Sequence, residues 1–308
     1  MIVNKIFIKI LSKGSDIMEN RQNSTNINWY PGHMAKTKRL ILENINLIDI
    51  VYELIDARMP YSSKIKDIDE ILKDKPRILV VTKMDLCDQK ETAKWLNYYK
   101  EKGYHIVTLD LEHGNVKSLL YKTMDIMREL NEKRIAKGLK NRKIRSLIVG
   151  IPNVGKSTLI NRLVGKKATN VGNKPGVTKN LNWIRIGNEL ELLDTPGILW
   201  PKFDDDIIAF NLASLSAIKE EVLPIEDVAY YILSCLNQYY PHILLERYGI
   251  SELDDDIVET LEWIGKKRGC LIKGGIVDYD KVYNVIINDV KLGHIKNITF
   301  DRFDNYDK

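Results

Sequence analysis

Short apolar runs rich in β-branched residues alternate with amphipathic stretches over the first two-thirds of the chain. The apolar runs predict strands at residues 49–56, 77–83, 105–110, 145–150, 181–187 and 190–195. Between them, apolar residues at helical spacing predict helices near residues 34–46, 90–102, 115–140 and 156–165. Alternating strands and helices indicate an α/β fold built on a mostly parallel sheet.

After Pro201 the strand pattern fades, and stretches with helical spacing follow at residues 207–215, 228–240, 256–269 and 278–293. We therefore expect an α/β domain at residues 28–202 and a smaller helical domain at residues 203–308. Residues 1–27 precede the first strong motif and are expected to form a flexible extension. A chain of 308 residues, 44% of them hydrophobic, is long enough to bury a core in two domains.

The formal net charge of +5 conceals an asymmetry. Residues 203–308 hold 11 Lys and Arg against 20 Asp and Glu, which leaves 36 basic against 22 acidic residues in the rest of the chain. A basic N-terminal part favours a polyanionic partner, although lysines scattered over a solvated surface would give the same balance.

No apolar run approaches the ~20 residues of a membrane span. The N-terminal segment is interrupted by Lys5 and Lys9 and lacks a cleavage site, so it does not resemble a signal peptide. Cys87, Cys235 and Cys270 show no metal or redox spacing, which favours reduced thiols. We expect a cytoplasmic monomer without a membrane partner.

The segment GIPNVGKS at residues 150–157 matches the complete phosphate-loop pattern, and it lies between a predicted strand and a predicted helix. A chance glycine-rich turn would rarely combine these features. Backbone N–H groups of such a loop surround phosphates, a Lys contacts the β- and γ-phosphates, and a Ser ligates Mg²⁺. The pattern predicts phosphate binding by Asn153, Val154, Gly155, Lys156, Ser157 and Thr158, with Lys156 also catalytic and Ser157 on Mg²⁺.

Two further residues would complete a site for Mg²⁺ and the γ-phosphate. Asp194 ends a predicted strand in the segment DTPG and is the expected acidic partner of Mg²⁺, with the Gly197 N–H directed at the γ-phosphate. Thr178 lies between the phosphate loop and DTPG, where a switch threonine would close over Mg²⁺ and the γ-phosphate.

The segment Thr82-Lys83-Met84-Asp85 follows a predicted strand and resembles the tetrapeptide by which GTPases read guanine. Asp85 would accept hydrogen bonds from guanine N1–H and the N2 amine, which adenine cannot supply, and Lys83 would lie along the base. The segment precedes the phosphate loop, so either it is a coincidence or the domain is circularly permuted. This order of motifs results when the usual ends of a Ras-like P-loop GTPase domain are joined and the chain is cut between DTPG and the base-reading strand.

The ordered set of motifs resembles the circularly permuted GTPases of the YlqF/YawG group. The resemblance also rests on NWYPGHMAK (28–36), DARMP (56–60), NKPGVT (173–178), DTPGILWP (194–201) and RGCLIKGGIVDYDK (268–281). It implies a GTPase that acts late in assembly of the large ribosomal subunit, binds ribosomal RNA and is stimulated by the particle. The helical domain would contact RNA.

Ile198 stands where Ras-like enzymes usually place the glutamine that orients water. The resemblance implies that His33 supplies this function once the ribosome orders its segment, whereas packing beside neighbouring aromatic residues is the alternative. Asn153 resembles a ligand for K⁺ in related GTPases, whereas stabilisation of its loop is the alternative. Arg58 could contact phosphate or RNA, or form a structural salt bridge.

Two positions depart from the family pattern. Thr82 replaces the commoner Asn, so we expect the loss of an amide that braces guanine and the phosphate loop. The loop that usually meets guanine O6 reads DLEHG at residues 110–114, and we assign that role to Asp110 and Leu111.

The densest basic stretch covers residues 128–145 and begins and ends with Arg128 and Arg145. Phosphate contact needs only such charge, but a solvated helix face looks the same. No RNP-type aromatic motif is present, which favours recognition of RNA shape and backbone. The predicted RNA contacts are Lys133, Arg134, Lys137, Lys140, Arg142, Lys143, Lys266, Lys267 and Arg268.

The sequence thus predicts a GTPase that requires Mg²⁺ and K⁺, docks on the maturing large subunit with GTP bound, and leaves after hydrolysis. A GTPase acting on another RNA or a signalling partner, and a GTP-dependent RNA-binding module with little hydrolysis, remain as alternatives.

Overall fold

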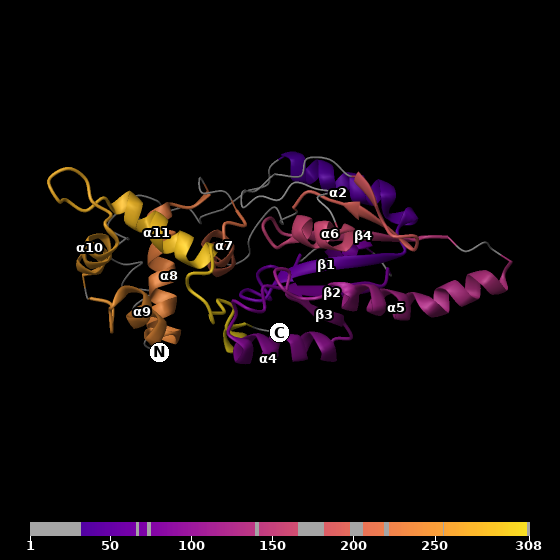
Figure 1. Ribbon diagram of the computed structural model, residues 1–308, viewed down its shortest axis with the longest axis horizontal. Coiled ribbons are helices and arrows are strands. Elements are labelled where there is room, and N and C mark those ends of the chain that lie inside the picture. Colours follow the sequence, from indigo (N-terminus) through magenta and orange to yellow (C-terminus); the bar gives the residue numbers. More distant parts are fainter. Residues whose placement is uncertain are drawn as a thin grey trace.

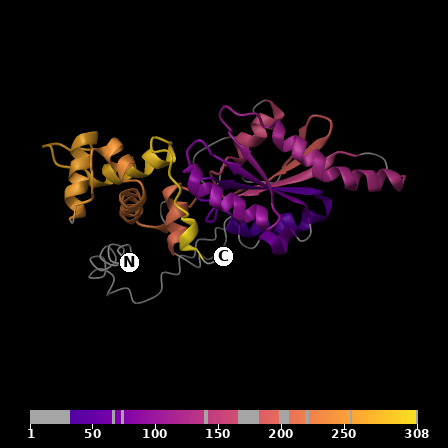
Figure 2. The ribbon, with the colours of Figure 1, turned by 90° about the horizontal axis from the view of Figure 1, so that it is seen from below.

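The computed structural model describes residues 32–65, 68–72, 75–138, 142–165, 182–197, 206–218, 222–254 and 256–306. An α/β domain lies beside a group of helices formed by the later part of the chain (Figures 1 and 2). The predicted extension of residues 1–27 lies outside the described residues. Within the ranges given above, no helix is long and apolar enough to cross a membrane.

One six-stranded sheet forms the centre of the α/β domain, in the order β3-β2-β1-β4-β6-β5. Every neighbouring pair is parallel except β5 with β6, so the predicted mostly parallel sheet is confirmed. All the predicted strands are present within two residues of their expected ends. Their bounds are β1 Ile50–Asp56, β2 Arg77–Thr82, β3 His105–Leu109, β4 Ile144–Gly150, β5 Asn182–Ile186 and β6 Leu190–Asp194.

Helices cover both faces of the sheet, because successive side chains of each buried strand point to opposite faces. Leu79 and Val81 of β2 pack with Trp95 of α4 on one face. On the other face, Tyr52 of β1 shares a 2.8 Å hydrogen bond with Thr123 of α5. The helices of this domain are α2 Gly32–Asn44, α3 Ile68–Leu72, α4 Gln89–Glu101, α5 Lys117–Ala136 and α6 Lys156–Val164.

The later helices pack mainly on one another, with α8 and α11 at their centre (Figure 1). The predicted helical spacing is confirmed for α7 Asp206–Ser214, α8 Ile225–Tyr239, α10 Ile257–Arg268 and α11 Tyr279–Lys291. The sequence reading missed α9 Pro241–Tyr248, which has Pro at its start and ends at Gly249 with φ 71°. Pro241 and Gly249 are ordinary signals for the start and the end of a helix. Only Tyr240 separates this helix from α8.

The end of the chain returns to the α/β domain. The backbone N–H of Phe300 donates to Arg58 O at 2.7 Å, and Trp95 Nε1 donates to Asp301 O at 2.9 Å. The Asp301 carboxylate is fully buried and accepts hydrogen bonds from the backbone N–H groups of Tyr61 and Ser62, both at 2.7 Å. Residues 203–308, which the sequence suggests as one helical domain, therefore include a segment that closes onto the first domain.

Candidate functional site

The phosphate-loop segment connects β4 to α6 at the carboxyl end of the sheet. Asn153 and Gly155 have φ angles of 60° and 107°, and Gly155 is the residue immediately before the helix. Backbone turns of this kind direct N–H groups inward, and the first turn of α6 adds its own N–H groups to the same concavity. A Cβ atom on Gly155 would lie 2.7 Å from Leu111 Cδ1, so both φ and space require glycine here.

Lys156 lies buried beneath this loop, where its Nζ donates to Gly150 O at 2.9 Å and to Ile151 O at 2.8 Å. Burial lowers the pKa of Lys156 to about 8, and Asp194 partly offsets that effect. The ammonium is therefore held within the concavity by carbonyl groups that a phosphate could replace as its partners.

Asp194 ends β6 and is 1% exposed. Neither of its carboxylate oxygens has a hydrogen-bond partner within the part of the chain that is described. Burial raises the pKa of Asp194 to about 6, while Lys156 pulls it down. A buried carboxylate without hydrogen bonds is costly, and a divalent cation supplies the missing partner. The residues present therefore fit Mg²⁺ next to the start of α6, which carries Ser157.

Gly197, the glycine of DTPG, lies against the phosphate loop. A Cβ atom on this residue would come within 2.8 to 2.9 Å of Pro152 atoms. The close approach of two backbones explains the glycine, and it places the DTPG segment beside the phosphate site. Thr178 and Ile198 lie outside the described residues.

The base-reading segment meets the phosphate loop directly. Lys83 has a φ of 59°, and its Nζ lies 3.0 Å from Asp56 Oδ2 and donates to Asn153 O at 2.9 Å. The hydroxyl oxygen of the buried Thr82 lies 2.8 Å from Val154 O. We expected the loss of an amide that braces guanine and the phosphate loop. The Thr82 hydroxyl itself contacts a loop carbonyl, so a contact to the loop is present, whereas the loss of a contact to guanine stays a prediction.

Asp85 follows on the exposed side of the same turn. Its carboxylate makes no hydrogen bond or ion pair with the residues that the structure describes, so both oxygens are open to a ligand. Burial lowers the pKa of Lys83, and the charges of Asp56 and Asp85 partly offset this effect.

The loop at residues 110–114 is held from two sides. Asp110 Oδ1 accepts from the backbone N–H groups of Glu112 at 2.8 Å and His113 at 3.0 Å. Arg162 of α6 donates to Leu111 O at 2.6 Å and to Gly114 O at 2.8 Å. The Asp110 side chain therefore shapes the turn. The sequence reading missed Arg162, because its partners are about 50 positions away and no local motif marks the contact.

Arg58 is a structural residue. Its side chain is 1% exposed, forms two hydrogen bonds with the Asp56 carboxylate at 2.9 and 3.1 Å, and donates to Val290 O at 2.9 Å. Burial opposes ionisation of Asp56, but Arg58 and Lys83 hold the pKa of this carboxyl well below its usual range. The structural alternative is therefore correct, and Arg58 is not available to phosphate or RNA.

Asn153 links the phosphate loop to the helical part of the chain. Its Nδ2 donates to Ser216 O at 2.6 Å, just after α7. His33 lies within α2, but its side chain is outside the described residues. The Asn153 amide thus stabilises the contact between the loop and the residues after α7, whereas the expected roles of Asn153 in K⁺ binding and of His33 and Thr178 in hydrolysis stay predictions.

The basic residues predicted to contact RNA have different surroundings. Lys133 and Lys266 pair with Glu129 and Glu262 one helical turn away, and Lys137 is exposed at the end of α5. Arg142 forms a bidentate pair with Asp49, at 2.6 and 2.8 Å.

Arg268 and Lys267 show the same contrast between a side chain bound to the protein and an exposed one. Arg268 donates to Arg247 O and lies over the Tyr248 ring, whereas Lys267 is exposed. The guanidinium groups of Arg142 and Arg268, which would bind phosphate, are thus already bonded within the protein. Lys140 lies outside the described residues.

Comparisons with known proteins agree with this geometry. The family described as "50S ribosome-binding GTPase" matches residues 145–272, and the family described as "RsgA GTPase" matches residues 34–203. "Ribosome biogenesis GTPase A" of Priestia megaterium is 49% identical over 277 residues, which are 89% of this chain and 96% of the relative. The protein of the same name from Thermotoga maritima is 32% identical over 276 residues, with 90% and 94% covered.

Two solved structures are also similar. "Crystal structure of GNP-bound YlqF from T. maritima" superposes with a TM-score of 0.62 at 28% identity, covering 87% of this chain and 98% of that chain. The GDP-bound structure of the same protein has a TM-score of 0.62 at 27% identity, covering 86% and 100%. The likeness extends over both the α/β domain and the later helices.

Proposed function

This chain is a circularly permuted GTPase of the ribosome biogenesis GTPase A family, and we propose that it binds the maturing large ribosomal subunit in its GTP state and leaves after subunit-stimulated hydrolysis. The observation that carries the proposal is the meeting of three segments at one end of the sheet. Thr82 and Lys83 touch the phosphate loop, and Gly197 approaches it from the other side. The match of residues 145–272 to a 50S ribosome-binding GTPase family supports the partner.

Guanine selection belongs to Asp85, whose exposed carboxylate would accept the N1–H and N2 protons of the base. Lys83 would lie along the ring, held by Asp56 and the loop carbonyl of Asn153. The turn of Asp110 and Leu111 would close the site near guanine O6. These roles make the protein specific for GTP over ATP.

Phosphate binding belongs to the loop of residues 153–158, with Lys156 turning its ammonium from carbonyl groups to the β- and γ-phosphates. Mg²⁺ would be held by Ser157, Thr178 and the unpaired carboxylate of Asp194, and it would neutralise charge on the phosphates. The Gly197 N–H would bind a γ-phosphate oxygen. K⁺ is proposed as a further cofactor, with Asn153 as its ligand.

Hydrolysis is expected to be slow without the particle, because Ile198 cannot orient water. His33, four residues after Trp29 and at the start of α2, would hold the attacking water once subunit binding fixes its segment. Basic residues of α5 and α10 would contact ribosomal RNA. We also propose that the protein works in the cytoplasm as a monomer.

The test is GTP turnover in K⁺ buffer, alone and with purified large subunits, mature and immature. We expect turnover to rise about tenfold or more with the particle, as for a site completed by a conformational step. The His33→Ala variant should bind GTP normally and lose the stimulation. Equal turnover with and without every particle would contradict the proposed partner, and a stimulated His33→Ala variant would contradict the role of the histidine.

A further inference from the structure

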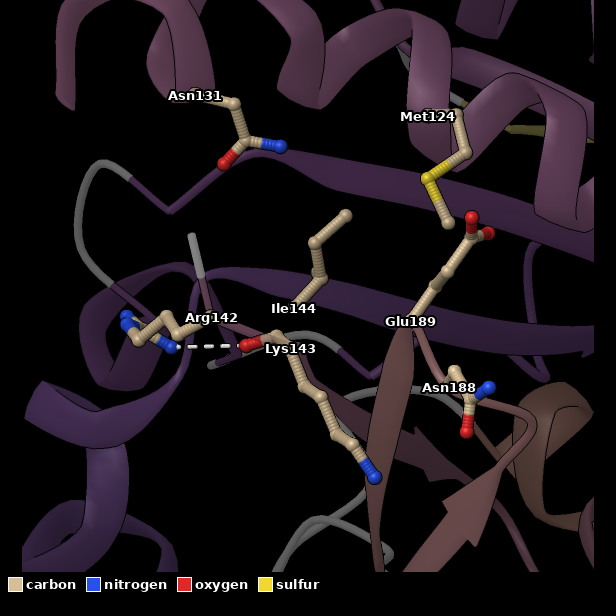
Figure 3. Close-up of a pocket in the computed structure, with 7 residues that line it drawn as sticks. All are labelled: Met124, Asn131, Arg142, Lys143, Ile144, Asn188 and Glu189. Atoms are coloured by element: carbon tan, nitrogen blue, oxygen red, sulfur yellow. Dashed lines mark hydrogen bonds between the residues drawn. The ribbon is translucent and has the colours of Figure 1, made fainter. Parts of the chain in front are cut away.

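A cavity of about 460 Å³ lies at the end of the sheet opposite the phosphate loop, and Figure 3 shows its lining residues. It lies between the C-terminal half of α5, the start of β4 and the turn from β5 to β6, and its volume is in the ordinary range for small-ligand sites, about 300–1,000 Å³. The sheet fixes two of its walls, because Ile144 pairs with Leu190 and its N–H donates to Glu189 O at 2.8 Å.

The polar side chains of this cavity have unused hydrogen-bonding capacity. Among the described residues, the side chains of Asn131, Lys143, Asn188 and Glu189 form no hydrogen bond and no ion pair. Arg142 at the rim differs, because its guanidinium is committed to Asp49. The lining thus carries a carboxylate and two amides, and the side chain of Lys143 extends away from Asn131 and Glu189 (Figure 3). This set suits a neutral ligand with both donors and acceptors better than a bare phosphate.

The remaining lining is apolar. Ile144 is 4% exposed and forms part of the wall, and the Met124 side chain reaches in from α5 (Figure 3). Aliphatic and thioether groups pack well on the faces of planar rings. A nucleobase combines a flat apolar face with polar edges, and amide side chains such as Asn131 and Asn188 can pair with those edges. The carboxylate of Glu189 is exposed and carries no protein partner among the described residues, so it can accept from the exocyclic amine of a base.

The helix above the cavity carries positive charge. The C-terminal turns of α5 extend beyond the rest of the α/β domain (Figure 1). They carry Lys133 and Arg134, and Lys137 follows as the C-cap. Phosphates of a nucleic acid can bind such residues without sequence preference, whereas bases are read by polar groups in pockets. In RNA the bases open to such reading are those of unpaired nucleotides.

We propose that this cavity receives one unstacked nucleoside of a folded RNA, with an amine-bearing base (adenine, cytosine or guanine) against Glu189 and the flanking phosphates on the end of α5. The inference rests on the proposed function and specifies how the α/β domain recognises its RNA. Uracil is disfavoured because its one donor, N3–H, lies between two carbonyl oxygens that would repel the carboxylate.

The test measures binding of the full-length protein, by fluorescence anisotropy, to labelled RNA hairpins with one stem sequence. The hairpins carry a single bulged A, C, G or U, or no bulge. We expect the A, C and G bulges to bind about tenfold more tightly than the unbulged stem, since a good polar contact to a base gives about tenfold to a hundredfold discrimination. Equal affinity for all five hairpins, or no RNA binding at all, overturns the inference.

Variants separate the pocket from general charge. Asn131→Ala should reduce the affinity for bulged hairpins to that for the unbulged stem. Glu189→Gln should narrow the difference between the A and U bulges, because the new amide can donate to a uracil carbonyl while it can still pair with adenine. Lys133→Ala should weaken binding to every hairpin alike, and Glu101→Gln, on an exposed carboxylate of α4, should change nothing. If the pocket variants retain the preference for bulges, the cavity is not its source.

Two further measurements distinguish RNA binding from binding of a free nucleotide, and this inference from the proposed function. Adenosine monophosphate should bind far more weakly than the bulged hairpin, and equal affinity would show that the cavity takes a free nucleotide, against the inference. GTP turnover with large subunits is measured on the same preparations. Stimulated turnover without bulge preference overturns this inference alone, whereas unstimulated turnover with a bulge preference supports it and contradicts the proposed partner.

Discussion

The hydroxyl oxygen of Thr82 lies 2.8 Å from the carbonyl oxygen of Val154, although the two residues are 72 positions apart in the chain. The contact joins the end of the base-reading strand to the phosphate loop. Lys83, the next residue, donates to the adjacent loop carbonyl of Asn153, and both of these residues have positive φ angles. The two motifs therefore hold each other in place even though the permuted chain reaches them in the reverse of the usual order.

Removal of the Thr82 hydroxyl tests this contact. Thr82→Val keeps the shape and leaves the Val154 carbonyl without its partner, so the free energy of unfolding should fall by about 1 kcal/mol. Because the loop is less well held, GTP affinity should fall about fivefold to tenfold. Chemical denaturation and titration with a fluorescent GTP analogue measure the two effects.

Thr123→Val is the matched control, because that hydroxyl bonds Tyr52 between α5 and β1 and does not touch the loop. It should cost similar stability and leave GTP affinity unchanged. A Thr82→Val variant that binds GTP as tightly as the wild type would contradict the bracing role.

The guanine assignment predicts a change of substrate. Asp85→Asn converts an acceptor into a group that also donates, so GTP affinity should fall by about tenfold to a hundredfold, the usual range for a lost charge-assisted hydrogen bond. Xanthosine triphosphate, which carries a carbonyl in place of the guanine amine, should then compete with GTP. Competition binding measures the ratio, and a variant that still prefers GTP as strongly as the wild type would assign base reading to other residues.

Asp194 predicts a pH-dependent stability in buffer without Mg²⁺ and nucleotide. Burial raises the pKa of this carboxyl from 3.8 to about 6. Between about pH 4 and pH 6 the native protein therefore holds more protons here than the unfolded chain, so this group lowers the free energy of unfolding as pH rises through that window.

Asp194→Asn removes that effect. Above pH 6 the variant should be more stable than the wild type by about 1–3 kcal/mol, and the difference should vanish near pH 4. Thermal or chemical unfolding at several pH values measures it. Asp85→Asn, on an exposed carboxylate, serves as the control and should follow the wild type. With Mg²⁺ and GTP, Asp194→Asn should lose turnover, and a stability difference independent of pH would contradict the argument.

The closing segment at the end of the chain depends on Asp301. Besides the N–H groups of Tyr61 and Ser62, its carboxylate accepts from Asn211 Nδ2 at 2.8 Å and from Tyr306 Oη at 2.7 Å. Asp301→Ala leaves these buried donors without a partner, so the free energy of unfolding should fall by about 3 kcal/mol or more.

The nearby Asp304 offers a comparison. Its carboxylate is 78% exposed and pairs with Lys94 on the surface, so Asp304→Ala should change stability by no more than about 0.5 kcal/mol. Urea denaturation of both variants provides the test. Equal effects of the two substitutions would mean that the segment at residues 298–306 adds little to the fold.

Much of the α/β domain could be predicted because its signals are local. Apolar runs, most of them β-branched, predicted every strand of the described sheet, and the order of the motifs predicted the permutation. The phosphate loop needed only the glycines, Lys156 and Ser157 at fixed spacing. These features are readable because neighbouring residues along the chain determine them.

The contacts that sequence reasoning missed are between distant residues. Nothing near Arg162 indicates that it holds the turn of residues 110–114, and nothing near Asn153 indicates Ser216. The contact of Thr82 with the phosphate loop was not expected, because its hydroxyl was considered only as the absence of an amide, although a hydroxyl can also contact a carbonyl. Charge density likewise could not separate Arg142, which is bound to Asp49, from the exposed Lys137.

The return of the chain end to Trp95, Tyr61 and Arg58 has a consequence for synthesis. Domains usually fold in the order in which they leave the ribosome, the N-terminal one first. Here part of the first domain stays uncovered until residues 298–306 have been translated, because these residues supply its cover. A truncated product that ends after α11 would retain every nucleotide-binding motif but would expose this surface. The nascent chain therefore completes its GTPase domain only after the helices that follow it have been made.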